Sequence, residues 1–192
     1  MARRYRKRGL DKTARRIVEF LETQGVEGGT VLEIGGGVGE IQIELLKRGA
    51  RRTVNLELSA AYEGEAQALL AEAGFADRVE RRRLDIAVAP ESVEPADAVV
   101  LHRVVCCYPD YERLLGAAAG RAGRLLVFSY PRRNPMSRLW VAGQNLAFRV
   151  MGKEFRPFAH PPAAMLDVLR ARGLDIAYAH KRLVWQVSGL AR

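Results

Sequence analysis

The chain has 192 residues, of which 48% are hydrophobic, 28% charged and 7% aromatic, and its formal net charge is +9. This length is enough for one domain with a sizeable core, and the ordinary composition excludes a disordered or collagen-like protein. No apolar run approaches the roughly 20 residues that a membrane helix needs, so we expect no membrane span.

The positive charge is concentrated at the amino terminus. Residues 1–16 carry eight Lys/Arg and one Asp, whereas the rest of the chain is nearly neutral. We therefore divide the chain into a basic arm and helix over residues 1–28 and a domain over residues 29–192. The arm could be solvated, could bind nucleic acid or another anionic partner, or could fold over a site as a lid.

The two cysteines, Cys106 and Cys107, are adjacent and cannot build a disulfide framework. This indicates a reducing compartment, and because no secretory signal opens the chain we predict a cytoplasmic protein. An Arg-rich start is also typical of transit peptides, but little serine accompanies it. No His/Cys cluster has the spacing of metal ligands, so we expect no metal site.

From residue 30 onward the pattern alternates strands and helices, which predicts an α/β fold with a mostly parallel sheet. The connection between the last two strands is too short for a helical crossover, so we expect a C-terminal antiparallel strand pair. The predicted strands are 30–34, 53–58, 79–84, 97–102, 124–129, 175–180 and 183–188, and the predicted helices are 12–25, 40–48, 59–74, 109–115, 134–151 and 161–173.

The most informative segment is VLEIGGGVGE at residues 31–40, where a strand ends in glycines and a helix begins. Glycine permits a tight turn and the close approach of a ligand to the backbone. The dinucleotide fingerprint G-x-G-x-x-G fits at Gly35 and Gly37 but would place Glu40 at its third glycine. A carboxylate there would face a pyrophosphate, so we do not expect a dinucleotide.

The spacing is instead G-x-G-x-G, formed by Gly35, Gly37 and Gly39, with Gly36 inside it and Glu33 before it. This segment resembles motif I of the class I S-adenosylmethionine-dependent methyltransferases. The resemblance extends in order and spacing over residues 30–130. It implies a Rossmann-like, seven-stranded, doubly wound sheet, with the last strand inserted beside the fifth, and S-adenosyl-L-methionine as the cofactor, released as S-adenosyl-L-homocysteine.

The resemblance also implies roles for individual residues. Glu57, which ends the second strand, would hold the ribose hydroxyls, with Leu58 beside it. Asp85 and Ile86 would hold the adenine, and Glu33 would orient the methionine end. Glu57 could also be a strand-end carboxylate that faces solvent, and Asp85 an ordinary loop residue.

Two residues at the ends of the fourth and fifth strands are candidates for catalysis. His102, which is also a candidate cofactor contact, could accept a proton because its unperturbed pKa lies near ~6.5. Tyr130 follows the predicted fifth strand. A structural hydrogen bond is the alternative role for His102. Arg103 could clamp an anionic acceptor or lie free at the surface.

The absence of two known motifs narrows the range of possible methyl acceptors. Residues 102–105 read HRVV, where enzymes that methylate exocyclic amines of bases carry [DN]-P-P-[YFW], and the double-glutamate loop of protein arginine methyltransferases is absent. We therefore expect a small-molecule acceptor, either anionic or apolar. An RNA methyltransferase that grips phosphates with its basic arm and a non-catalytic nucleotide-binding accessory protein are the alternatives.

A looser resemblance concerns residues 105–137, which are similar to the corresponding stretch of magnesium-protoporphyrin O-methyltransferases. The helix after it is amphipathic. We expect it to cover the edge of the sheet, and contact with a membrane or a large apolar substrate is the alternative. Its apolar side carries Leu139, Trp140, Leu146 and Val150, and its polar side Arg138, Asn145 and Arg149.

Overall fold

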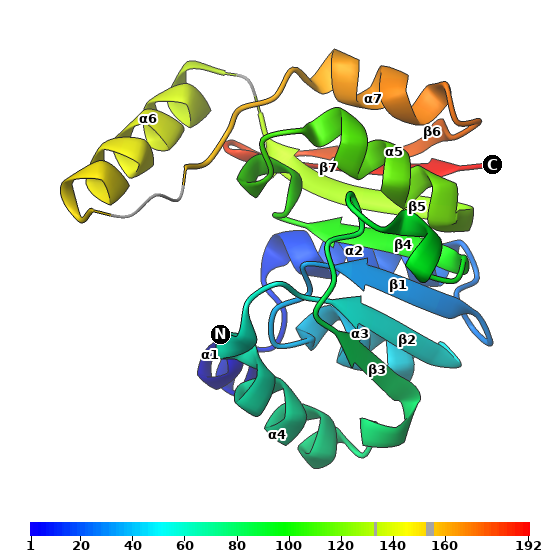
Figure 1. Cartoon of the computed structure of the whole chain (residues 1–192). Helices are drawn as coiled ribbons and strands as arrows, with labels where there is room; N and C mark the ends of the chain where they lie inside the picture. Colours follow the sequence, from blue (N-terminus) through cyan, green and yellow to red (C-terminus); the bar gives the residue numbers. More distant parts are fainter. Residues whose placement is uncertain (133, 153–155) are drawn as a thin grey trace.

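The computed structural model describes residues 1–132, 134–152 and 156–192, apart from the side chains at 137, 138, 140 and 141. Its sheet has seven strands in the order β3-β2-β1-β4-β5-β7-β6, and β7 runs antiparallel to both its neighbours (Figure 1). The predicted α/β sheet, with its C-terminal antiparallel pair, is therefore confirmed. The strands are β1 (Thr30–Ile34), β2 (Arg52–Leu56), β3 (Val79–Arg82), β4 (Ala96–His102), β5 (Ala122–Pro131), β6 (Asp175–Lys181) and β7 (Trp185–Ala191).

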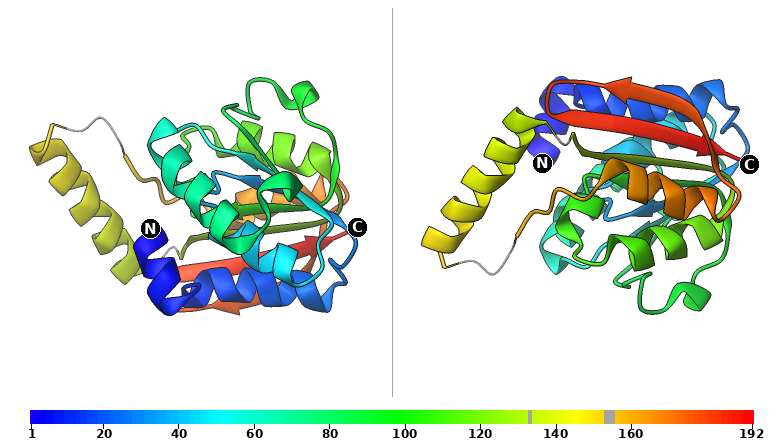
Figure 2. Two further views of the ribbon diagram at one scale, coloured as in Figure 1. Left: turned by 90° about the horizontal axis from the view of Figure 1, so that it is seen from below. Right: turned by 90° about the horizontal axis from the view of Figure 1, so that it is seen from above.

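Helices cover both faces of this sheet (Figure 2). One layer contains α2 (Lys12–Thr23), α3 (Glu40–Lys47) and α4 (Glu63–Ala73), and the other contains α5 (Tyr111–Arg121) and α7 (Pro162–Arg170). Successive side chains of β4 point to opposite faces of the sheet, and both faces are covered by helices, which explains why its sequence is continuously apolar. Ala98 and Val100 pack on the side of α2, whereas Val99 and Leu101 pack on the side of α5.

The boundaries of α5 differ from those predicted. A helix from Pro109 to Leu115 was expected, but α5 begins at Tyr111 because the Asp110 carboxylate caps it by accepting from the Arg113 backbone N–H at 3.0 Å. It then continues to Arg121. The extension is rich in alanine and glycine, and its Ala118 and Ala119 share one core cluster with Met165 and Leu169 of α7.

The basic arm is folded. It forms a helix that was not predicted, α1 (Ala2–Arg8), whose Ala2 side chain is fully buried against α3 and α4. The following helix α2 contributes Ile17, Val18 and Leu21 to the core beneath the sheet. The division at residue 28 therefore cuts through one packed layer, because α2 belongs to the body of the domain.

Helix α6 (Pro135–Val150) stands away from the sheet (Figure 1). It occupies the segment predicted to be helical, and its apolar residues Leu139, Leu146 and Val150 are 74%, 64% and 80% exposed. The side chains of Trp140 and Arg138, also assigned to this amphipathic pattern, lie outside the described residues. Within the described part of the chain, no helix is long and apolar enough to cross a bilayer.

Candidate active site

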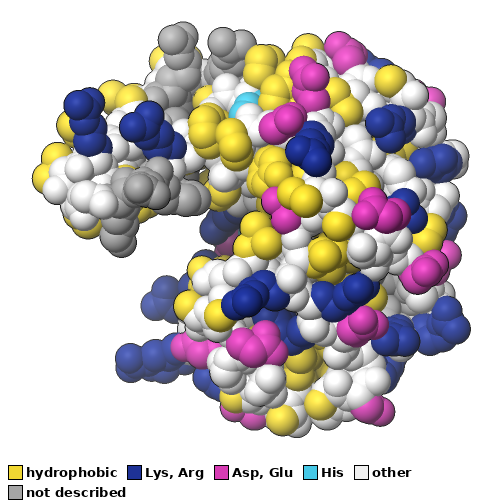
Figure 3. Space-filling model, in the orientation of Figure 1, with side chains coloured by type: hydrophobic (Ala, Val, Ile, Leu, Met, Phe, Trp, Pro, Cys, Tyr) yellow, Lys and Arg dark blue, Asp and Glu magenta, His cyan; other side chains and the backbone are white. Residues whose placement is uncertain are grey.

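A cavity of about 540 Å³ lies where β1, β2 and β4 end, at the point where the strand order reverses. In open α/β sheets, ligands bind in the crevice at this point. Figure 3 shows the molecule hollowed on this side, between the projecting α6 and the body of the domain. The sequence-predicted residues that line the cavity are Gly35, Gly37, Glu57, Leu58, Asp85, Ile86 and His102.

The glycine loop that follows β1 forms the floor of the cavity. Gly35 and Gly37 have φ angles of 67° and 53°, in the left-handed region that side chains disfavour. A Cβ atom on Gly35 would also overlap the Val104 side chain. The loop is thus compatible with little besides glycine, and its backbone lies open to a ligand.

Two carboxylates line the cavity at the ends of β2 and β3, and each is held by hydrogen bonds. Glu57 accepts from the backbone N–H groups of Gly37 and Ser59, both at 2.9 Å. Asp85 accepts from the Ala87 N–H at 2.9 Å and from the Tyr108 hydroxyl at 3.0 Å. Each carboxylate oxygen can accept a second hydrogen bond, so both groups remain able to bind hydroxyl or amino groups of a ligand.

Three of the predicted cofactor contacts lie behind the loop and do not line the cavity. Glu33 is 2% exposed, and burial together with the nearby charge of Glu40 raises its pKa well above the ordinary value. It packs against Gly36, while Gly39, at φ 83°, is the N-cap residue before α3. Glu33 can therefore act on a ligand only through the loop that it supports.

Arg81 is a residue of this site that sequence reasoning missed. Its guanidinium donates to the Gly37 carbonyl oxygen at 3.0 Å and to the Glu63 carboxylate at 3.0 Å, and so ties the loop to α4. It lies in the charged segment VERR of β3, and no local pattern distinguishes it from its neighbours.

His102 lies at the cavity wall with both ring nitrogens close to partners. Its Nδ1 is 3.0 Å from Ser129 Oγ, and its Nε2 is 3.8 Å from the Asp11 carboxylate. Ser129 Oγ also accepts from the Arg103 N–H at 2.9 Å, so it links His102 to the backbone that follows β4. Burial is the main cause that lowers the pKa of His102, and it favours the neutral form of the ring. Nδ1 is thus engaged with Ser129, and Nε2 faces Asp11.

Tyr130 does not reach the cavity. It lies within β5, is 1% exposed, and stacks on Phe128 with ring centroids 4.8 Å apart. Its hydroxyl shares a hydrogen bond with Ser188 Oγ at 3.0 Å. The structure therefore places this candidate catalytic residue in the core, because β5 continues past the predicted end and turns Tyr130 inward.

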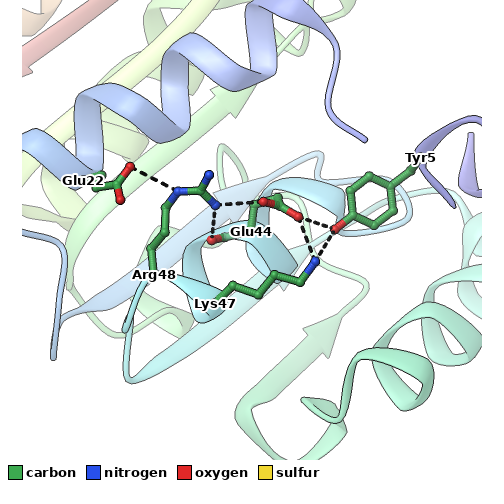
Figure 4. Close-up of polar contacts among 5 residues, drawn as sticks. All are labelled: Tyr5, Glu22, Glu44, Lys47 and Arg48. Atoms are coloured by element: carbon green, nitrogen blue, oxygen red, sulfur yellow. Dashed lines mark hydrogen bonds and ion pairs between the residues drawn. The ribbon is translucent and has the colours of Figure 1, made fainter. Parts of the chain in front are cut away.

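The amino terminus borders the cavity. Met1 lines it beside the glycine loop, and α1 is fastened to α3 through Tyr5, whose hydroxyl donates to Glu44 at 2.7 Å (Figure 4). Lys47 and Arg48 pair with the same carboxylate at 2.9 and 2.8 Å. Burial raises the pKa of Glu44, but these three hydrogen bonds outweigh it and lower the pKa to about 2.

These features fit S-adenosylmethionine better than a nucleotide. The cavity is mostly apolar, and two fixed carboxylates, those of Glu57 and Asp85, line it. A sulfonium cation tolerates nearby carboxylates, whereas a pyrophosphate does not. Among the described residues, no group of three or more His, Cys, Asp or Glu side chains could hold a metal ion.

The fold and the cavity together define a Rossmann-like enzyme of the class I S-adenosylmethionine-dependent type. A family described as "Methyltransferase domain" matches residues 2–179, and the chain belongs to this methyltransferase family. A search of curated protein sequences found no match.

Solved structures share the fold at low sequence identity. The magnesium protoporphyrin IX methyltransferase of Synechocystis PCC 6803, with bound S-adenosylhomocysteine, superposes with a TM-score of 0.76 at 21% identity, over 94% of this chain and 82% of that one. An O-methyltransferase family protein from Burkholderia thailandensis gives 0.75 at 19%, over 94% and 56%. A Pyrococcus horikoshii protein assigned as an RNA methyltransferase gives 0.64 at 13%, over 94% and 81%.

Proposed function

We propose that the 540 Å³ cavity binds S-adenosyl-L-methionine and that the enzyme transfers its methyl group to a small-molecule acceptor. The cavity carries this proposal, because it brings together the glycine loop, Glu57 and the Asp85–Ile86 pair from three different strand ends. The cofactor supplies an electrophilic methyl group on a sulfonium.

The residues of the chain would divide the binding task. Glu57 would accept hydrogen bonds from the ribose hydroxyls, and Asp85 from the adenine amino group, while Ile86 packs on the base. Gly37 would leave room for the methionine end. Because backbone N–H groups and Tyr108 already orient both carboxylates, little rearrangement is needed on binding.

Transfer itself would depend on positioning. Methyl transfer is an in-line displacement, and much of the rate enhancement comes from holding the two reactants in the right geometry. His102 would order the wall of the cavity through Ser129 and Asp11, since its Nδ1 lies 3.0 Å from Ser129 Oγ and its Nε2 lies 3.8 Å from the Asp11 carboxylate. We therefore propose an acceptor that is already nucleophilic at neutral pH.

A small-molecule acceptor is supported by the relatives that share the fold, including the protoporphyrin enzyme, and by the dimensions of the site. Met1 and α1 would cover one side of the cavity as a lid, and the exposed apolar side chains of α6 would offer a second wall to an apolar acceptor.

The test is methyl transfer from radiolabelled S-adenosylmethionine to the small-molecule fraction of a cell extract. The proposal predicts labelled product in that fraction. S-adenosylhomocysteine binding without label in any fraction would instead indicate a non-catalytic accessory protein.

RNA remains a second candidate, because several cations of the basic arm are exposed. Arg3, Lys7 and Arg8 form no ion pair within the described part of the chain, whereas Arg4 and Arg6 pair with carboxylates of the domain. Binding to generic RNA that weakens steeply with salt, together with label in the RNA fraction, would favour this candidate. Undetectable RNA binding at low salt would exclude it.

A further inference from the structure

A second cavity, of about 310 Å³, adjoins the first at the same edge of the sheet. It lies between the start of α2 and the turn that joins β6 to β7. Arg103, at the end of β4, lines both cavities and therefore separates them. The other residues of the second cavity are Asp11, Lys12, Thr13, Arg182, Leu183, Val184 and Trp185.

The charge of this second cavity is positive. Lys12, Arg103 and Arg182 line it, against one carboxylate, that of Asp11. Asp11 is already engaged, since it forms an ion pair with Arg103 at 2.8 Å and lies 3.6 Å from Arg4. Neither Lys12 nor Arg182 forms an ion pair with a described carboxylate. Two cations are thus left without a countercharge at its rim.

Arg103 is held in an unusual conformation. Its φ angle is 59°, and no other non-glycine residue in the described ranges has a positive φ. Residues with such strained backbone conformations cluster at functional sites. The backbone N–H donates to Ser129 Oγ, and the guanidinium lies over the Trp185 ring, 4.8 Å from its centroid. The strain thus places a cation and an aromatic surface together beside the cofactor cavity.

We propose that this second cavity is the acceptor subsite and that it holds a carboxylate carried on an aromatic or apolar body. Arg103, Lys12 and Arg182 would bind the carboxylate, and Trp185 with Leu183 would contact the body. The remainder of the acceptor would extend past Arg103 towards the first cavity. This inference rests on the proposed function, because it assigns the acceptor side of the same site.

The test uses Trp185 as a fluorescent reporter. The chain has two tryptophans, so a Trp140→Phe protein retains Trp185 alone. Phenylacetate is titrated into this full-length protein, and phenylacetamide, which has nearly the same shape but no charge, serves as the matched ligand. We expect a saturable change in Trp185 emission with phenylacetate and none with phenylacetamide.

Substitutions then locate the anion. Arg182→Gln and Lys12→Gln, both at exposed positions, should each weaken phenylacetate binding about three- to tenfold, and Arg103→Gln by about tenfold or more. Arg170→Gln, on the exposed surface of α7, is the control and should leave the affinity unchanged. If Arg103→Gln fails to fold, the two surface variants still decide the matter.

Two results would overturn the subsite. The first is that phenylacetate and phenylacetamide bind equally well, or that neither binds. The second is that the affinity for phenylacetate is unchanged in both surface variants. Calorimetry with S-adenosylhomocysteine on the same proteins separates this failure from that of the proposed function. Arg182→Gln should bind S-adenosylhomocysteine as tightly as the unsubstituted protein does. If the unsubstituted protein itself does not bind S-adenosylhomocysteine, the proposed function is contradicted.

Discussion

Replacement of Glu57 by alanine is the most informative perturbation of the cofactor cavity. The carboxylate lines the cavity at the end of β2, with each oxygen already fixed by one backbone N–H. In the proposed complex each oxygen would accept one further bond, from a ribose hydroxyl. Both would be lost in Glu57→Ala.

The size of the expected loss of affinity follows from the charge of the Glu57 carboxylate, which is the hydrogen-bond acceptor. A hydrogen bond to a charged group is worth about 1.5–3 kcal/mol. If water that enters the space recovers about half of the loss of two such bonds, about 1.5–3 kcal/mol remains, equal to a decrease in affinity of about 10- to 150-fold. Glu57→Gln keeps one acceptor oxygen and should lose about tenfold.

The assay is calorimetric titration with S-adenosylhomocysteine. Glu94→Ala, an exposed carboxylate that precedes β4 at the opposite end of the sheet, is the control and should bind as the unsubstituted protein does. Thermal unfolding of Glu57→Ala reports whether the loop beside Gly37 has loosened. An affinity within twofold of the unsubstituted protein, in a folded Glu57→Ala, would refute the ribose role.

Three further predictions concern the structure around the site. Gly35→Ala should lower the free energy of unfolding, measured in urea, by about 2–4 kcal/mol, because Gly35 has a positive φ and a Cβ atom there would overlap Val104. Gly28→Ala, with a similar φ but open space around it, should lose about 1 kcal/mol, and equal losses would contradict the overlap. Because burial lowers the pKa of His102 below that of an unfolded histidine, near ~6.5, the unfolded chain binds the proton first and stability should fall from pH 7 to about pH 5. His102→Asn should reduce this slope, and an unchanged slope would refute the assignment. Tyr130→Phe should retain methyl transfer while losing about 1 kcal/mol of stability, and abolished transfer in a folded variant would restore its catalytic role.

The parts of the site that the sequence predicted are those built from one continuous segment. The strand over 30–34, the glycine turn and α3 all follow from residues 31–40, where periodicity and the conformational freedom of glycine decide the structure locally. Glu57 and Asp85 were predicted from the resemblance to the methyltransferase family, and both come soon after a strand, at the edge where parallel strands end.

The parts that were missed depend on contacts between distant residues. Arg81 reaches the Gly37 carbonyl across 44 positions, and Asp11 lies beside His102 although 91 positions separate them. The direction in which the Tyr130 side chain points depends on the pairing of β5 with β7. This pairing keeps Tyr130 within the strand, opposite Gln186. No pattern in the local sequence reports these pairings.

The central claim is that the cavity at the ends of β1, β2 and β4 holds the methyl donor. A crystal structure with S-adenosylhomocysteine tests it most directly. The account predicts the ribose at Glu57, the adenine between Asp85 and Ile86, and the homocysteine end over Gly37. A ligand bound elsewhere, or a ribose that makes no contact with Glu57, would contradict it.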